Sequence, residues 1–292
     1  MKGIVYEYSQ AANPKMVKVP MKTFELDTKR FSKTTVFPFN MQQLFNTTYC
    51  CTTPSLLAEV VQMLKNDLLS VERNSFTQIF YVLKGSGSTL FNDGTILWSK
   101  GDIIVTNTTK CTHKSYEESQ LLMITDEPLL NYMGLSKKVS KFATCIFKKH
   151  ELYDALAQKG NVHNNRCGIL LGIKETENTT KTISHTLWCL FNKIASNSVQ
   201  KPHRHNSVAL DLCIYAQDQK VYTLIGDALD SNGNIVNPQK VYWRTNTLFV
   251  TPPGMWHSHH NESDEDAFVL PVQDAGIHTY LQTLDIQFDN SL

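Results

Sequence analysis

Residues 201–215 read KPHRHNSVALDLCIY, and residues 247–261 read TLFVTPPGMWHSHHN. In the first stretch His203 and His205 lie two positions apart on a predicted strand, so both imidazoles project from one face while Arg204 points away. In the second stretch a predicted strand enters a Pro-Pro-Gly turn and returns with His257. Neutral imidazoles from two strands are suitable ligands for one metal ion.

A single histidine is more often an ordinary core or surface residue, and a His-x-His pair alone is weak evidence. The pair here is followed about fifty residues later by a Pro-Gly turn, His257 and Asn261, all in β-rich sequence. This combination favours a metal site over the ordinary alternative. We therefore predict that His203, His205 and His257 bind one metal ion inside a β-barrel.

The strand pattern continues on both sides of these stretches. Short β-rich runs separated by Gly, Asn and Asp turns begin at Phe76 and recur from Cys167 to about Val272. Regularly spaced short strands are typical of barrels and sandwiches. We predict an all-β chain with two tandem barrels: residues 1–135, a partly helical linker at 136–165, and a metal-binding barrel at 166–292.

A few helices are expected around the barrels. Residues 54–69 carry apolar side chains at helical spacing after Pro54 and Ser55, which predicts an amphipathic helix. Residues 128–135 and 150–158 have helical character as well, and residues 276–288 predict a short capping helix.

Composition indicates which binding partners and which cellular compartment to expect. The formal net charge is +1, from 28 Lys and Arg against 27 Asp and Glu, and the basic residues are scattered. We expect neither nucleic-acid nor membrane binding. The N-terminus has no apolar signal region, and the seven Cys residues form no C-x-x-C pair. Reduced thiols and a cytoplasmic location are therefore expected.

The two histidine stretches resemble the two motifs of the cupin family, H-x-H on one strand and P-G-x-x-H-x-x-x-N on another. Many cupins add a Glu ligand, but Ala209 and Leu210 occupy those positions here. This three-His variant resembles the bicupins of the gentisate 1,2-dioxygenase group over residues 185–288. The resemblance implies double-stranded β-helix (jelly-roll) barrels and ring cleavage by O₂ at Fe(II), with Zn, Mn or Ni as other candidate metals.

The resemblance also implies a small-molecule substrate, a hydroxylated aromatic or related chelator, and a homo-oligomer. Two alternatives stay open. One is a cupin that binds a metal and a small molecule without catalysis. The other is a redox-neutral Zn or Mn isomerase or hydrolase, because three neutral His ligands also suit Zn.

Further site residues follow from the resemblance, position by position. His259 matches a catalytic group that hydrogen-bonds substrate or oxygen, with an ordinary histidine beside the metal as the alternative. His260 is placed on the surface. The residues matched to substrate binding or to the pocket lining are Trp188, Asn192, Arg166, Trp256, Met255 and Asp274.

Asp211 marks a departure from the family pattern. It stands where the family has an Arg that meets the substrate carboxylate, and a carboxylate there would repel that group. The residue therefore predicts a substrate that lacks this carboxylate, or a cation or a polyol. In the first barrel, Arg73 aligns with Arg204, and Glu72 and His113 are two possible ligands without a third. We expect that barrel to be metal-free.

Overall fold

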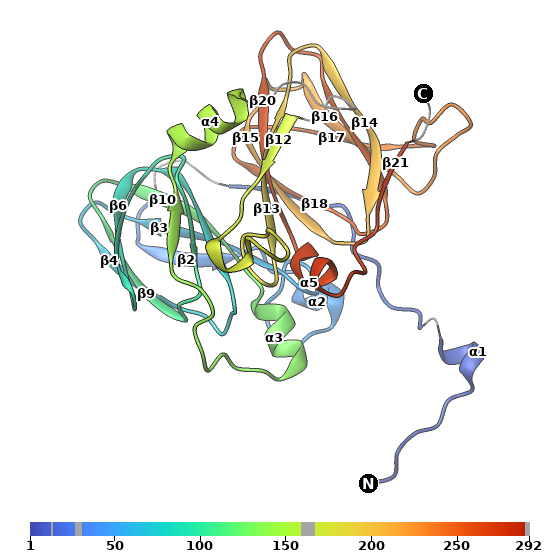
Figure 1. Cartoon of the computed structure of the whole chain (residues 1–292), viewed down its shortest axis with the longest axis horizontal. Helices are drawn as coiled ribbons and strands as arrows, with labels where there is room; N and C mark the ends of the chain where they lie inside the picture. Colours follow the sequence, from blue (N-terminus) through green and yellow to red (C-terminus); the bar gives the residue numbers. More distant parts are fainter. Residues whose placement is uncertain (13, 27–30, 159–166, 290–292) are drawn as a thin grey trace.

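The computed structural model describes residues 1–12, 14–26, 31–158 and 167–289. Its strands form four antiparallel sheets, which pair into two barrels side by side (Figure 1). The first barrel joins a six-stranded sheet, in the order β11-β8-β5-β10-β3-β2, to a four-stranded sheet, β4-β9-β6-β7. Their bounds are β2 Thr35–Pro38, β3 Leu57–Met63, β4 Leu68–Glu72, β5 Gln78–Lys84, β6 Ser86–Phe91, β7 Gly94–Ser99, β8 Ile103–Thr106, β9 Lys110–Ser115, β10 Ser119–Thr125 and β11 Cys145–Phe147.

The second barrel repeats this plan with one additional strand. Its six-stranded sheet has the order β1-β18-β15-β20-β13-β12, and its five-stranded sheet the order β17-β16-β19-β14-β21. Their bounds are β1 Thr23–Glu25, β12 Cys167–Leu170, β13 Trp188–Ile194, β14 Ser198–His205, β15 Ala209–Tyr215, β16 Val221–Gly226, β17 Gln239–Tyr242, β18 Thr247–Thr251, β19 Trp256–Asn261, β20 Ala267–Gln273 and β21 Ile286–Phe288.

Short helices lie around the sheets (Figure 1). They are α1 Tyr8–Ala11, α2 Gln42–Phe45, α3 Glu127–Met133, α4 Lys149–Ala157, α5 Ala275–Tyr280 and the 3₁₀ turn Lys174–Thr176. The helices expected at 128–135 and 150–158 are thus present as α3 and α4. The helix expected at 276–288 ends at Tyr280, and the strand β21 follows it.

The prediction of a helix at residues 54–69 was wrong. This stretch contains β3, the turn that follows it and the first two residues of β4. The two faces of β3 pack against different cores: Ala58 and Val60 against the core between the barrels, Val61 and Met63 against the interior of the first barrel. A strand that is apolar on both faces gives a nearly continuous apolar run, which also satisfies helical spacing.

The two six-stranded sheets pack against each other and form the largest hydrophobic core. In β15, Leu210 and Leu212 belong to this shared core. Because side chains alternate along a strand, Ala209, Asp211 and Cys213 face the interior of the second barrel, and Cys213 packs in that interior. The separate interior of the first barrel is lined by apolar residues such as Val71, Phe80 and Cys111.

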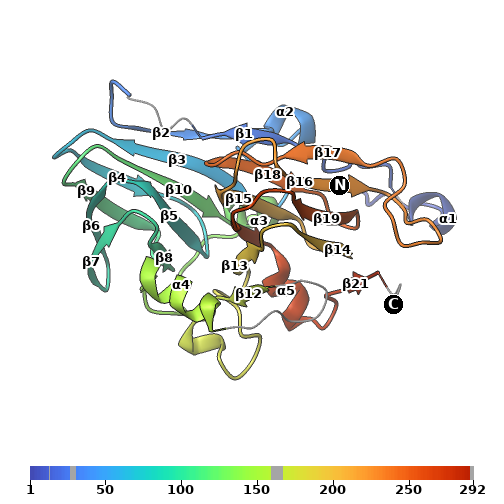
Figure 2. The same ribbon diagram turned by 90° about the horizontal axis from the view of Figure 1, so that it is seen from above.

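Two strands pair with a barrel to which their position in the sequence does not assign them. The early strand β1 pairs with β18 in the second barrel (Figure 2). The strand β11, from the connecting segment, pairs with β8 in the first barrel. The division at 1–135, 136–165 and 166–292 stays a prediction, and strand pairing crosses it at these two places. No helix among the described residues is long and apolar enough to span a membrane.

Candidate metal centre

Four histidines gather inside the second barrel, on two neighbouring strands. His203 and His205 come from β14, and His257 and His259 from β19. His203 lies directly opposite His257 in the ladder, and their ring centroids are 4.0 Å apart. The ring of His205 is 4.9 Å from that of His257, and the ring of His259 is 5.7 Å from it. All four side chains are buried.

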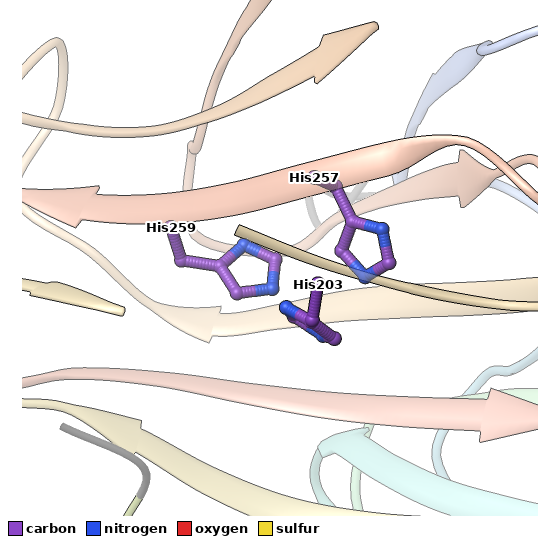
Figure 3. A group of neighbouring side chains, drawn as sticks. All are labelled: His203, His257 and His259. Carbon is purple, nitrogen blue, oxygen red and sulfur yellow. The ribbon is translucent and has the colours of Figure 1, made fainter. Parts of the chain in front are cut away.

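The nitrogen atoms of three of these rings converge on one small volume. Potential ligand atoms of His203, His257 and His259 lie within 4.8 Å of one another, as Figure 3 shows. His205 is outside this tightest group but adjoins His257. The structure therefore brings together all four histidines that the sequence singled out, and two overlapping three-His sets share His203 and His257.

An irregularity in β14 sets the direction of the His-x-His pair. Gln200 lies opposite His259 and His203 opposite His257, so three residues of β14 span two of β19. The additional residue falls at Lys201 and Pro202. Pro202 lacks the N–H that a ladder position requires, and such an interruption is where a strand accepts proline.

The turn before β19 is tied to the end of β14. Gly254 has a φ of 77°, a left-handed conformation that favours glycine. Its N–H donates to the carbonyl oxygen of His205 over 2.7 Å. The Pro-Pro-Gly motif therefore holds the start of β19, with His257, against the strand that carries the other two histidines.

Hydrogen bonds orient two of the rings in a way that suits metal binding. Nδ1 of His257 lies 3.0 Å from the carbonyl oxygen of Met255, and Nδ1 of His205 lies 2.8 Å from that of Ser207. A carbonyl oxygen only accepts, so each ring carries its proton on Nδ1 and presents the Nε2 lone pair. This is the usual outer hydrogen bond of a metal-binding histidine. The Ser207 hydroxyl donates in turn to Gln273 Oε1 over 2.9 Å.

Comparison with solved structures identifies the architecture. The chain superimposes on salicylate 1,2-dioxygenase from Pseudaminobacter salicylatoxidans with a TM-score of 0.69, at 13% identity, over 87% of this chain and 80% of that one. A Trp-to-Tyr variant of that enzyme in complex with gentisate gives a TM-score of 0.74, at 12% identity, over 98% and 92%. A variant of oxalate decarboxylase from Bacillus subtilis gives 0.54, at 12% identity, over 86% and 76%.

The chain has the bicupin fold. These likenesses, at 12–13% identity, concern the fold. No protein-family model matches the sequence, and no curated protein matches it.

The bicupin repeat shows what replaces the histidines in the first barrel. Thr223 pairs with His259 in the second barrel as Thr89 pairs with His113 in the first. Counting from that match, the first-barrel positions equivalent to His203, His205 and His257 are Val71, Arg73 and Cys111. Sequence comparison aligned Arg73 with Arg204, one residue away, because it could not detect the additional residue in β14.

Arg73 is held away from any metal role by an ion pair. Its Nε and Nη2 each lie 2.6 Å from an oxygen of the buried Glu59 carboxylate. Burial raises the pKa of the Cys111 thiol to about 12, which keeps it protonated. The equivalent positions in the first barrel thus carry an apolar side chain, a paired cation and a neutral thiol.

Asp211 faces the interior of the second barrel. By register it takes the place of Phe80, whose ring centroid lies 5.0 Å from that of His113 in the first barrel. The hydroxyl of Thr251 donates to its carboxylate. Burial raises the pKa of Asp211 to about 7, and the hydrogen bond from Thr251 opposes this change.

Two of the other predicted site residues make contacts away from the histidine rings, and a third is not described. Trp256 lies on the outer face of β19, where its ring stacks with the Arg204 guanidinium at 5.1 Å. The carboxylate of Asp274 accepts from Ser55 Oγ at 2.6 Å and from the backbone N–H of Val208 at 2.9 Å, at the contact between the barrels. Arg166 lies outside the described residues.

The remaining predicted residues lie on strands of the second barrel or next to them. Trp188 begins β13 opposite Gln273, and its buried Nε1 has no hydrogen-bond partner among the described residues. Asn192 lies against Gly168 of β12, which has no side chain to obstruct it. The side chain of Met255 packs next to the apolar interior, and its backbone carbonyl oxygen accepts a hydrogen bond from His257 Nδ1. His260 stacks on Tyr222, with ring centroids 4.8 Å apart.

Sequence reasoning missed the residues behind the histidines, namely Thr223, Trp243, Ser207 and Gln273. Thr223 Oγ1 lies 2.8 Å from His259 Nδ1 and accepts from Trp243 Nε1 at 2.7 Å. The arrangement of Thr, Trp and His recurs in the first barrel as Thr89, Trp98 and His113. The spacing in the sequence differs, however: the Thr and the His are 24 positions apart in the first barrel and 36 in the second. Because of this difference the repeat is not visible in a simple reading of the chain.

Proposed function

We propose that this bicupin is an Fe(II)-dependent dioxygenase that acts on a hydroxylated aromatic compound or a related small chelating substrate. The observation that carries the proposal is the pair His205 and His257. Both rings are buried and both direct Nδ1 to a backbone carbonyl oxygen, so both can present Nε2 to one metal ion.

The donor set fits iron, and His203 completes it. With His203, His205 and His257 as ligands, three imidazoles would hold the metal without a protein anion. Bound Fe(II) would supply redox chemistry with O₂, and its open coordination positions would accept a chelating substrate. The protein contributes a rigid set of rings, a buried surrounding, and His259 as a hydrogen-bonding group beside the ligands.

Asp211 shapes the choice of substrate. Its inward-facing neighbours on β18 are Thr251 and Phe249, and Gln273 faces inward from β20; none of these carries a positive charge. A substrate carboxylate directed to this wall would meet a carboxyl group instead of a cation. We therefore propose a substrate that chelates through ring hydroxyls, such as a catechol, and has no carboxylate on the Asp211 side.

Oxygen consumption tests the proposal. The chain is loaded anaerobically with Fe(II), and O₂ uptake is followed with catechols, hydroquinones, gentisate and salicylate. We expect uptake and a ring-opened product with a carboxylate-free substrate, and much less with salicylate. Absence of uptake across this panel in iron-loaded protein would refute the dioxygenase proposal.

Loss of one ligand provides the matched control. His257→Ala should bind less than a tenth of the metal that the parent chain binds, with an unchanged far-ultraviolet circular dichroism spectrum. His260→Ala, on the outer face of the same strand, should keep full metal content. Stoichiometric metal in His257→Ala would contradict the ligand assignment.

A redox-neutral Zn enzyme is the second candidate, and the all-imidazole donor set favours it, because three His ligands with an open position are a common catalytic zinc site. Elemental analysis of the purified protein separates the two candidates. Zinc at one equivalent, with no O₂ uptake after exchange to iron, would support the second.

A further inference from the structure

His257 and His259 lie on the same face of β19, two residues apart, but different groups hold their outer nitrogens. His257 Nδ1 faces a carbonyl oxygen, whereas His259 Nδ1 faces the hydroxyl of Thr223 over 2.8 Å. A carbonyl oxygen fixes the tautomer by itself, because it only accepts. A hydroxyl both donates and accepts, so the tautomer of His259 depends on the other neighbours of Thr223.

The second neighbour of this hydroxyl is a donor. Trp243 Nε1 lies 2.7 Å from Thr223 Oγ1, and an indole N–H can only donate. Both side chains are fully buried. Among the described residues, Thr223 Oγ1 therefore has two polar neighbours, one that must donate to it and one whose role is open.

The need of the buried Thr223 hydroxyl proton for an acceptor decides whether His259 Nδ1 donates or accepts. If His259 carried its proton on Nδ1, Thr223 would accept twice, and its own buried proton would have no acceptor within the described part of the chain. An unsatisfied buried donor costs about 1–3 kcal/mol. If Thr223 donates to Nδ1 instead, the indole proton of Trp243 and the hydroxyl proton of Thr223 both have an acceptor, and the ring proton of neutral His259 is on Nε2.

The first barrel contains an independent copy of this arrangement. Trp98 Nε1 donates to Thr89 Oγ1 over 2.8 Å, and Thr89 Oγ1 lies 2.7 Å from His113 Nδ1. His113 is fully buried, and burial lowers its pKa to about 4, so the ring is neutral. Its Nε2 lies 3.5 Å from Cys111 Sγ, which can accept the Nε2 proton. Here the same hydrogen-bond chain operates where no histidine occupies the equivalents of the proposed ligand positions.

We propose that Thr223 and Trp243 are positioning residues that hold His259 as an Nε2–H donor and keep it out of the set of metal ligands. His259 then directs a hydrogen-bond donor to the volume that His203 and His257 border. The ligand set is consequently His203, His205 and His257, although the nitrogens of His203, His257 and His259 form the tightest group. The inference rests on the proposed metal centre, but not on the identity of the reaction.

The tautomer is measured directly on the metal-free chain. Two-bond ¹H–¹⁵N correlation spectra of ¹⁵N-labelled protein show which imidazole nitrogen carries the proton, and the His259→Gln spectrum assigns the signals. We expect His259 to be protonated at Nε2, and His205 and His257 at Nδ1. Protonation of neutral His259 at Nδ1 would overturn the proposal. Because no metal is present, this result is independent of the dioxygenase proposal.

Substitution of the hydroxyl tests the positioning role. Thr223→Val keeps the shape but removes the donor, so the Nδ1–H tautomer of His259 becomes accessible and its Nε2 can join the ligand set. In Co(II)-loaded protein we expect an altered d–d absorption spectrum, which reports a change in coordination. Thr223→Ser should restore the parent spectrum, and a parent spectrum in Thr223→Val would contradict the proposal.

The first barrel supplies the matched control. Thr89→Val removes the equivalent hydroxyl and should change the His113 signals and the stability, while the Co(II) spectrum stays that of the parent. A spectral change of equal size in Thr89→Val and Thr223→Val would show a general loss of packing and overturn the assignment. If Thr223→Val does not fold, Trp243→Phe is measured instead, with Trp98→Phe as its control and the same two outcomes.

Discussion

The chemistry of the site is set by what each histidine touches behind its ring. His205 is held by the carbonyl oxygen of Ser207, and the Ser207 hydroxyl, 3.1 Å from the same Nδ1, donates on to Gln273. These contacts fix the ring angle as well as the tautomer. The proposed ligands thus depend on groups that a motif of histidines alone does not contain.

This dependence gives a prediction for Ser207. In Ser207→Ala the hydroxyl contact and the link to Gln273 are lost while the carbonyl oxygen that holds His205 remains, so metal affinity should fall, but by less than the roughly 10–100-fold that loss of the outer hydrogen bond itself causes. Competition with a chromogenic chelator measures this affinity. Ser258→Ala, on the opposite face of β19 where Ser258 contacts His260, is the control and should bind metal as the parent does. Equal affinity in Ser207→Ala and the parent would contradict the role.

Asp211 predicts a pH-dependent stability. Its pKa is raised to about 7 by burial, whereas in an unfolded chain an Asp ionises near roughly 3.9. At pH values between these two pKa values, the folded state binds the Asp211 proton more tightly than the unfolded chain does. The contribution of protonated Asp211 to the free energy of unfolding is therefore lost as the pH rises toward 7. A tenfold difference in proton affinity between the folded and unfolded states corresponds to about 1.4 kcal/mol.

Asp211→Asn removes this titration. Urea unfolding of the metal-free protein should show that the variant gains stability relative to the parent as pH rises from about 4 to 7, by a few kcal/mol in total, and that the difference is constant above that range. A difference that does not change with pH would show that Asp211 titrates normally.

Among the elements, β14 differs in register from β4, its counterpart in the first barrel. In the first barrel β4 pairs with β9 without a shift, from Leu68 to Glu72. In the second, the additional residue of β14 lies between Gln200 and His203, and both of these face inward. Because side chains alternate, one residue more or fewer reverses the face of everything that follows.

The length of this segment is therefore predicted to be essential. Deletion of Pro202 should turn His203 and His205 to the outer face of the sheet, and metal content should fall below a tenth of the parent value. Pro202→Val keeps the length and should keep the metal. Elemental analysis measures the metal, with circular dichroism to show that the sheet is retained. Full metal content in the deletion variant would show that β14 re-registers without harm to the site.

At the scale of the molecule, two aspartates connect the barrels in equivalent ways. Asp126, after β10, accepts from the N–H groups of Phe76 and Thr77 and from the hydroxyl of Thr186 in the other barrel. Asp274, after β20, accepts from Val208 N–H and from Ser55 Oγ in the first barrel. Asp274, predicted to bind substrate, thus has its carboxylate engaged by groups from both barrels.

These contacts should contribute to stability and not to metal binding. Thr186→Val and Ser55→Ala each leave a buried carboxylate with one donor fewer, so each should lower the free energy of unfolding by about 1–3 kcal/mol. Urea unfolding measures the loss, and metal content should stay at the parent value. Loss of metal in Ser55→Ala would instead connect Asp274 to the site.

The sequence by itself determined the all-β class and singled out the histidines of the proposed centre. Strand alternation is a local rule, so the spacing of His203 and His205 already placed both rings on one face. The turn residues before His257 are local signals as well. Asp211 also stood out from the sequence, because a single carboxyl group at that position changes the charge of the wall.

Only the tertiary structure decided that residues 54–69 form a strand, that Trp256 faces outward over Arg204, and that Asp274 lies between the barrels. It alone revealed which nitrogen of each histidine is engaged. The reason is physical: a tautomer is set by hydrogen-bond partners, and Thr223 and Trp243 reach His259 from positions 36 and 16 residues away. A periodic pattern in one segment carries no information about such partners.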